Sequence, residues 1–195
     1  MRVAAVVPFK RFTRAKRRLR SRYSGDEVQA IGRAMLTDVL EALQKAVSLE
    51  RVEVLTDDLE VDALARQLGA GVRLRAPDPG LNPAIEAAAR ELAAEGFDAV
   101  LTALGDLPLL KGADVDRVVA TGHEHPVVLV PSRDAGTALL YRRPPDCIPA
   151  RFGPDSATRH REAARLDLDT PEDVAQLLAS DVPCHTRDVL LALER

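Results

Sequence analysis

Two stretches of the chain are apolar at nearly every position rather than at every second one. They are Val3–Val7 and Ala99–Leu104. A strand with one solvent-exposed face alternates apolar and polar residues, whereas an unbroken apolar run is typical of a strand covered on both faces. Segments with helical periodicity separate these runs, so repeated βα units are expected. The chain is therefore predicted to be an α/β protein, a three-layer sandwich around a mostly parallel central sheet.

The expected elements alternate almost throughout the chain. Strands are predicted at Val3–Pro8, Val52–Thr56, Val72–Arg75, Ala99–Leu104, Val127–Pro131 and Thr137–Arg142. Helices are predicted after the capping box Ser24–Glu27, over Leu59–Leu68, after an Asn82 cap with Pro83 at the first position, near Ala113–Thr121, over Asp155–Ala164, and after Thr170 and Thr186. No linker or repeat divides the 195 residues, so one domain over 1–195 is expected.

The composition excludes several classes of protein. Aromatic residues make up only 3% of the chain and Trp is absent, which disfavours base-stacking platforms for nucleic acid. No apolar stretch is long enough to cross a membrane, and the chain enters a strand at once, without a signal peptide. Cys147 and Cys184 lack metal or redox spacing, which favours a cytoplasmic protein. A P-loop and a G-x-G-x-x-G motif are both missing, so a P-loop kinase or a Rossmann dehydrogenase is a poor candidate.

Two acidic residues are candidates for a metal site. Asp106 follows the apolar run 99–104, so it is expected at the carboxyl end of a central strand, where open α/β sheets bind ligands. Asp169 lies about sixty residues later, on the strand side of the Thr170 helix cap, and alternation puts it on the same face of that expected strand as Asp167. Two carboxylates suit Mg²⁺ that holds nucleotide phosphates. Each aspartate alone could equally form a turn or cap a helix.

Three loops could bind anions. Between Lys10 and Arg22 stand eight Lys or Arg residues and no acid, which suits a triphosphate or, alternatively, a solvated or nucleic-acid-binding tract. In Arg151–His160, Gly153 permits close backbone approach, and the helix start with the Ser156 hydroxyl is expected to face an anion. His160 lies one turn beyond Ser156, but by itself it is expected to be a core or surface histidine. Arg133 and Thr137 flank a loop that could bind phosphate or be a plain hairpin.

Taken in order, these motifs resemble the guanylyltransferases of coenzyme F-420 biosynthesis. The resemblance covers about Val3 to Asp173, and its more specific motifs are Pro131-Ser-Arg-Asp134 and Phe152-Gly-Pro-Asp-Ser156 with His160. Its further motifs are Val7–Lys10 with Ala15–Leu19, Thr56–Asp58, Gly80–Asn82, Gly105–Leu109 and Asp167–Asp173. Members include phosphoenolpyruvate and 2-phospho-L-lactate guanylyltransferases, which have a nucleotide-diphospho-sugar-transferase-like fold of the GT-A type.

The resemblance implies a Mg²⁺-dependent reaction of GTP with phosphoenolpyruvate or 2-phospho-L-lactate, with release of pyrophosphate. It implies that Lys16 and Asp106 are catalytic and that Asp106 and Asp169 bind Mg²⁺. Thr137, Gly153 and Ser156 would bind the phosphorylated acid, and Lys10, Lys16, Asn82 and Gly105 would bind the nucleotide. The expected partners are these two substrates, with neither nucleic acid nor membrane, and a homodimer is one option.

The chain departs from the family pattern at three positions. Ala135 and Ala138 replace a glycine and an asparagine, and Ala157 replaces an aromatic residue. The departures fall on the acid-binding side and leave the acceptor open. Alternatives are another nucleotidyltransferase of this fold, such as one that builds a molybdenum-cofactor nucleotide, a nucleic-acid-binding module that uses loop 10–22, and a member that binds nucleotide without catalysis.

Overall fold

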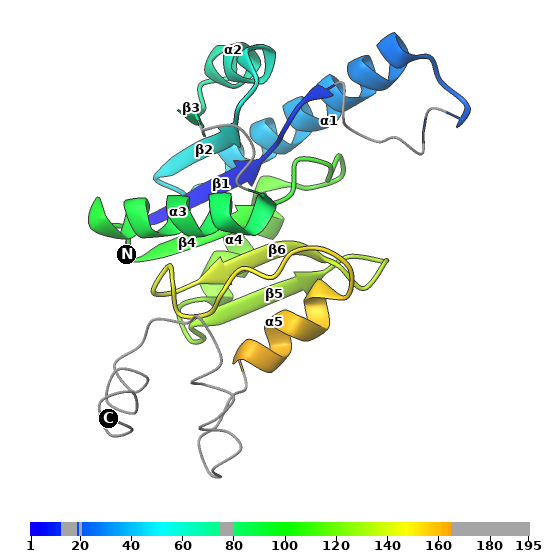
Figure 1. The fold of residues 1–195 in the computed structure, drawn as a ribbon. Helices are drawn as coiled ribbons and strands as arrows, with labels where there is room; N and C mark the ends of the chain where they lie inside the picture. Colours follow the sequence, from blue (N-terminus) through cyan, green and yellow to red (C-terminus); the bar gives the residue numbers. More distant parts are fainter. Residues whose placement is uncertain (13–18, 20, 75–79, 165–195) are drawn as a thin grey trace, which may run out of the picture.

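The computed structural model describes residues 1–12, 19, 21–74 and 80–164. Figure 1 shows one twisted sheet with helices on both faces. The strands are β1 (Val3–Pro8), β2 (Arg51–Thr56), β3 (Gly71–Leu74), β4 (Ala99–Ala103), β5 (Val127–Pro131) and β6 (Thr137–Arg142). The helices are α1 (Gly25–Lys45), α2 (Leu59–Gln67), α3 (Leu81–Ala94), α4 (Gly112–Thr121) and α5 (Ser156–Ala164).

The sheet is mostly parallel, as predicted. Its strand order is β3-β2-β1-β4-β6-β5. Strands β3, β2, β1 and β4 pair in parallel, and β6 pairs antiparallel with both β4 and β5. Because β6 runs backwards, its first residues lie at the same edge as the last residues of β1, β2, β4 and β5. Chain segments from both halves of the sequence therefore meet at this edge.

The core forms two layers, one on each face of the sheet. Val3, Ala5 and Val7 of β1 pack with α1, α2 and α4, whereas Ala4 and Val6 pack with α3 and the segment 148–152. Every residue of β4 is buried. The unbroken apolar runs thus reflect strands covered on both faces, and the three-layer prediction is confirmed. No helix in the described ranges is long and apolar enough to span a membrane.

Two helix starts differ from the prediction. Helix α3 has Gly80 as its N-cap and no side-chain cap, because the Asn82 amide is engaged elsewhere. Helix α5 begins at Ser156, not Asp155, since Asp155 has a left-handed backbone (φ 54°) that cannot continue a helix. The capping box is confirmed, with Ser24 and Glu27 bonding each other's backbone N–H groups.

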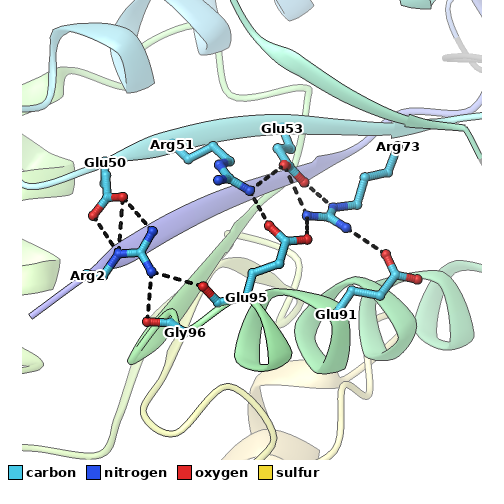
Figure 2. Close-up of polar contacts among 8 residues, drawn as sticks. All are labelled: Arg2, Glu50, Arg51, Glu53, Arg73, Glu91, Glu95 and Gly96. Carbon is cyan, nitrogen blue, oxygen red and sulfur yellow. Dashed lines mark hydrogen bonds and ion pairs between the residues drawn. The ribbon is translucent and has the colours of Figure 1, made fainter.

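An ionic cluster joins β2 and β3 to the last turns of α3, towards the edge of the sheet where the parallel strands begin (Figure 2). The Arg73 guanidinium contacts Glu53, Glu91 and Glu95, at 2.8 Å and 2.7 Å for the last two. Arg51 also pairs with Glu95, so the carboxylates near the end of α3 are neutralised where the helix dipole disfavours them. Glu53 is only 6% exposed, which makes this pairing necessary. The sequence motifs gave no indication of this cluster.

Candidate functional site

The candidate site lies at the opposite edge, where the carboxyl ends of β1, β2 and β4 meet. Thr56, at the end of β2, donates its hydroxyl to the Lys10 carbonyl (3.1 Å) and accepts the Asp58 N–H (3.1 Å). Asp58 caps α2, and Asp57 pairs with Arg11 at 3.2 Å. This motif therefore fixes the first residues of the basic loop beside β2, and the exposed Lys10 side chain starts from that anchored backbone.

Gly105 allows β4 and the residues after β1 to come together. A Cβ atom at this position would lie 2.6 Å from Cδ2 of Phe9, closer than any side chain tolerates. Phe9 in turn packs on Phe12, with ring centroids 5.3 Å apart. The glycine predicted to bind nucleotide thus has a clear packing role, which is to let the chain pass Phe9 and present Asp106 at the strand end.

Asp106 is half-buried and lines a groove of about 850 Å³. The groove is lined by Arg133 and Ala138 of the β5–β6 hairpin and by apolar residues such as Leu109, Val118 and Val130. The Leu104 N–H donates to the Ala138 carbonyl (3.2 Å), which joins the Asp106 turn to the start of β6. The Asp106 carboxylate and the Arg133 side chain therefore line the same groove.

A carboxylate oxygen is a ligand that Mg²⁺ prefers, so Asp106 fits the predicted metal. No group of three or more His, Cys, Asp or Glu side chains that could hold a metal occurs within the described ranges. Mg²⁺ commonly uses one or two carboxylates, with water and substrate phosphates as the other ligands, so one described carboxylate is compatible with it. Asp169, the second predicted ligand, and Lys16 lie outside the described residues, as do Asp167 and Cys184.

The β5–β6 hairpin loop is fixed by its own polar contacts. Asp134 Oδ1 accepts from the Ser132 hydroxyl (2.5 Å) and the Gly136 N–H (3.3 Å). The Ala135 carbonyl accepts the Ala157 N–H (3.2 Å), and the Gly153 carbonyl accepts the Ser156 N–H (3.2 Å). These amides at the start of α5 are therefore not free to bind an anion, contrary to the prediction. The Ala157 N–H joins the hairpin to the helix, and the Ser156 N–H closes the turn that precedes the helix.

Ala135 has a left-handed backbone (φ 62°), at a position where the resembled family has glycine. A Cβ atom in this region costs roughly 1–2 kcal/mol, which exceeds the entropy that glycine adds to the unfolded chain. Ala135→Gly is expected to raise the free energy of unfolding by about 0.5–1 kcal/mol in urea denaturation. The same change at Ala138, in the extended strand β6, should lower it. Equal effects of the two changes would contradict this reading of the loop.

Three consecutive backbone N–H groups near the site are held by side chains. The N–H of Ala150 donates to Glu86 Oε1 (2.6 Å), that of Arg151 to His160 Nε2 (2.8 Å), and that of Phe152 to Asn82 Oδ1 (2.8 Å). The Asn82 amide also donates to the Phe152 carbonyl (3.1 Å). Asn82, predicted to bind nucleotide, thus supports the backbone immediately before Gly153, which itself has a positive φ of 126°.

Two of the three residues predicted to bind the acid, Thr137 and Ser156, lie in a buried cluster with a histidine. Thr137, Ser156 and His160 are each at most 1% exposed. The Ser156 and Thr137 hydroxyl oxygens lie 3.0 Å apart, and His160 Nδ1 lies 2.9 Å from Thr137 Oγ1. Phe152 packs edge-on against the ring, with centroids 5.1 Å apart. The expectation of a core histidine is confirmed, and its two nitrogens connect β6 to the 150–152 segment.

Burial is the main cause of an altered pKa at His160. Burial, reinforced by the positive charges of Arg142, Arg159 and Arg151, lowers the pKa of His160 to about 4. These arginines come from β6, from α5 and from the segment before Gly153. The ring is therefore neutral at physiological pH, inside a positively charged setting that suits an anionic ligand.

Stability should consequently depend on pH through His160. The unfolded histidine binds a proton below pH about 6.5, whereas the folded one stays neutral until about pH 4, so its contribution is complete above pH 6.5 and is lost as the pH falls. Between pH 7 and pH 4.5, the free energy of unfolding of the unmodified protein should fall by about 2 kcal/mol more than that of the His160→Gln variant. Urea denaturation of both proteins at each pH measures this difference. Equal losses would show that the folded ring accepts a proton readily.

The sequence motifs did not identify two residues that hold the backbone near the site, Arg142 and Glu86. Arg142 is completely buried and donates through Nη1 to Glu86 (2.7 Å) and to the Ile148 carbonyl (2.9 Å). Its Nε and Nη2 have no hydrogen-bond partner among the described residues. The only sequence signal was an arginine at the end of the apolar strand Thr137–Arg142, and a glutamate within the helix after Pro83.

Comparison with known proteins gives one family. The profile described as "Guanylyl transferase CofC like" matches residues 3–193. A phosphoenolpyruvate guanylyltransferase of Sphaerobacter thermophilus is 35% identical, with 91% of this chain and 93% of that protein covered. A 2-phospho-L-lactate guanylyltransferase of Methanothermobacter thermautotrophicus is 32% identical (99% and 92% covered), and a 3-phospho-D-glycerate guanylyltransferase of Phenylobacterium zucineum is 36% identical (92% and 91% covered).

Solved structures agree on the fold. A Desulfovibrio desulfuricans protein, whose name places it provisionally among the nucleotide-diphospho-sugar transferases, superposes with a TM-score of 0.70 at 18% identity. The match covers 100% of this chain and 96% of that one. The predicted nucleotide-diphospho-sugar-transferase-like fold is confirmed.

Proposed function

We propose, because the chain belongs to the guanylyl transferase CofC-like family, that it transfers the guanylyl group of GTP to a phosphorylated three-carbon acid. The observation that supports this proposal is that two groups lie at the same edge of the sheet, where the Leu104 N–H bonds to the Ala138 carbonyl. They are the Asp106 carboxylate, after β4, and the Thr137–Ser156 hydroxyl pair, at the start of β6 and α5. A nucleotide and an acid acceptor need such adjoining sites.

The reaction we propose exchanges one phosphoanhydride bond for another. A phosphate oxygen of the acid attacks the α-phosphorus of GTP, a new P–O–P bond forms, and the bond to the β-phosphate breaks to release pyrophosphate. The attacking oxygen is already anionic, so it needs little help from a general base. The main difficulty is to bring several negative charges into line, which cationic side chains and fixed donors overcome.

Each predicted residue has a place in this proposal. Asp106 and Asp169 would hold Mg²⁺, which when bound neutralises phosphate charge and orients the reacting groups. Lys10 and Lys16 would bind the triphosphate as cations. Thr137, Ser156 and the backbone at Gly153 would bind the acid. Asn82 would hold the backbone before Gly153, and Gly105 would let the chain pass Phe9, so both would support the nucleotide site. Arg142, Arg151 and Arg159 add positive charge around the acid subsite.

The acceptor class follows from the relatives taken together. Their names specify phosphoenolpyruvate, 2-phospho-L-lactate and 3-phospho-D-glycerate, which share a phosphate and a carboxylate on a three-carbon skeleton. We propose one of these as the acceptor, within coenzyme F-420 biosynthesis in the cytoplasm, and a homodimer as the assembly. Neither nucleic acid nor a membrane takes part in this proposal.

The test is a matrix of four nucleotides (GTP, CTP, ATP and UTP) and the three acids, with Mg²⁺ present or chelated. Product mass and pyrophosphate release are measured for each pair. We expect product only with GTP, and none after chelation. A preference for CTP with no product from these acids would favour another nucleotidyltransferase of this fold. Absence of product together with duplex binding that weakens steeply with salt would favour the nucleic-acid module.

A further inference from the structure

His160 sets the direction of a buried hydrogen-bond chain. Its Nε2 accepts the Arg151 N–H at 2.8 Å, so a neutral ring must carry its single proton on Nδ1. Nδ1 lies 2.9 Å from Thr137 Oγ1 and therefore donates to it. The backbone N–H of Arg151 thus selects the tautomer, and the tautomer decides which way the neighbouring hydroxyls point.

Counting protons shows the consequence. Thr137 and Ser156 have two hydroxyl protons between them, and the 3.0 Å bond joining their oxygens uses one. The ring adds a third proton to this group, and that proton is donated to Thr137 Oγ1. One hydroxyl proton of the pair therefore remains, and it has no acceptor among the described residues. With the opposite tautomer, Thr137 would donate to Nδ1 and Ser156 to Thr137, and both protons would be used. Only the Nδ1–H tautomer leaves a donor.

We propose that His160 is a positioning residue for the acid substrate, because its Nδ1–H tautomer leaves one O–H donor of the Thr137–Ser156 pair for a substrate oxygen. This inference rests on the proposed function, which places the phosphorylated acid at that pair. Hydrogen-bond donors stabilise a bound anion, and acceptors repel it. The direction of the hydrogen bonds from His160 through Thr137 and Ser156 therefore decides whether this pair attracts an anionic substrate.

The environment preserves this direction of the hydrogen bonds. A cationic ring would turn Nε2 into a donor facing the donor N–H of Arg151, and that contact would break. Burial opposes protonation of the ring most strongly, and the guanidinium groups of Arg142, Arg159 and Arg151 add to this effect. The positive charge that suits an anionic substrate therefore also keeps His160 neutral.

Two substitutions separate the two nitrogens. His160→Asn can place an amide donor near the Nδ1 position. His160→Gln reaches the Nε2 position instead, so Thr137 keeps its own proton but loses the ring donor that fixes the direction of its O–H. We expect His160→Gln to raise the KM for the acid about 3- to 10-fold, as for the loss of one neutral hydrogen bond that orients the donor, with the KM for GTP within about twofold. His160→Asn should recover most of the loss. His125→Gln, at an exposed histidine, is the matched control.

A second measurement needs no variant. The ¹⁵N chemical shifts of the imidazole nitrogens in the unmodified protein should show Nδ1 protonated and Nε2 unprotonated between pH 6 and pH 8. Phosphoenolpyruvate binding to the unmodified protein and to His160→Gln, followed by calorimetry, should weaken by the same factor as KM. The Nε2–H tautomer, or an unchanged acid KM and affinity in His160→Gln, would overturn the inference.

These outcomes are separable from failure of the proposed function. If no nucleotide gives product although the Nδ1–H tautomer and the difference in phosphoenolpyruvate affinity are observed, the proposed reaction is wrong and the role of His160 stands. If product forms but the tautomer is Nε2–H, the reaction stands and the role of His160 is wrong.

Discussion

Asp106→Asn is expected to reduce the rate of product formation by at least about 10³-fold, with little change in the free energy of unfolding. The amide has the shape of the carboxylate but no charge, so it cannot offset the positive charge of a metal ion or help to hold it against triphosphate. Asp106 is half-buried and lines a groove rather than packing in the apolar core, so we expect the loss of its charge to cost little stability. Steady-state kinetics and a urea denaturation curve measure the two effects.

Asp114→Asn is the matched control. Asp114 lines the same groove but pairs with Arg117 on the surface of α4, at 3.3 Å. Its substitution should leave the rate within about twofold, because an exposed ion pair contributes little. An Asp106→Asn protein that keeps more than a tenth of the activity would remove the carboxylate from the proposed mechanism.

Glu86→Ala should destabilise the fold by about 3 kcal/mol, the largest stability effect we expect from a single side chain outside the apolar core. Glu86 Oε1 accepts from Arg142 and from the Ala150 N–H, and Arg142 is completely buried. Removing the carboxylate leaves a buried positive charge uncompensated and a backbone donor unpaired. Thermal or urea denaturation, compared with that of the unmodified protein, gives the size of the loss.

A variant that removes both charges of the Arg142–Glu86 pair distinguishes the effect of charge on stability from the effect of packing. Arg142→Met combined with Glu86→Gln removes both charges, keeps similar volume, and leaves an amide oxygen for Ala150. This double variant should be more stable than Glu86→Ala, because no buried charge stays unpaired. Glu60→Ala, which removes an exposed partner of Arg33, should cost well under 1 kcal/mol. A Glu86→Ala protein as stable as Glu60→Ala would contradict the assignment of Glu86 as the main partner of Arg142.

The parallel layers of this fold can be predicted from the sequence because burial on both faces leaves a direct mark on strand composition. The apolar runs at β1 and β4 and the capping box before α1 each depend on neighbours close in sequence. Asp106 could be located for the same reason, since a strand, a glycine and a proline in succession define a strand end.

The supports of the site could not be predicted, because their partners are far apart in sequence. Asn82 precedes an apolar helical segment and resembles a cap, yet its amide pairs with Phe152, seventy residues later. Glu53 and Arg142 interrupt apolar strands, and nothing local shows that each meets an opposite charge from α3 or β3. Local propensity predicts a helix start, but tertiary contacts decide which residue occupies it.

The side-chain hydrogen bonds to the backbone of residues 150–152 should slow the exchange of their amide hydrogens with solvent. Loop amides normally exchange with deuterium almost as fast as those of an unfolded peptide, because water reaches them directly. Here the N–H groups of Ala150, Arg151 and Phe152 are bonded to Glu86, His160 and Asn82. Exchange therefore requires an opening that separates the segment from α3 and α5 together. In a deuterium-exchange experiment this loop, which has no helix or strand of its own, should behave as part of the slowest-exchanging core.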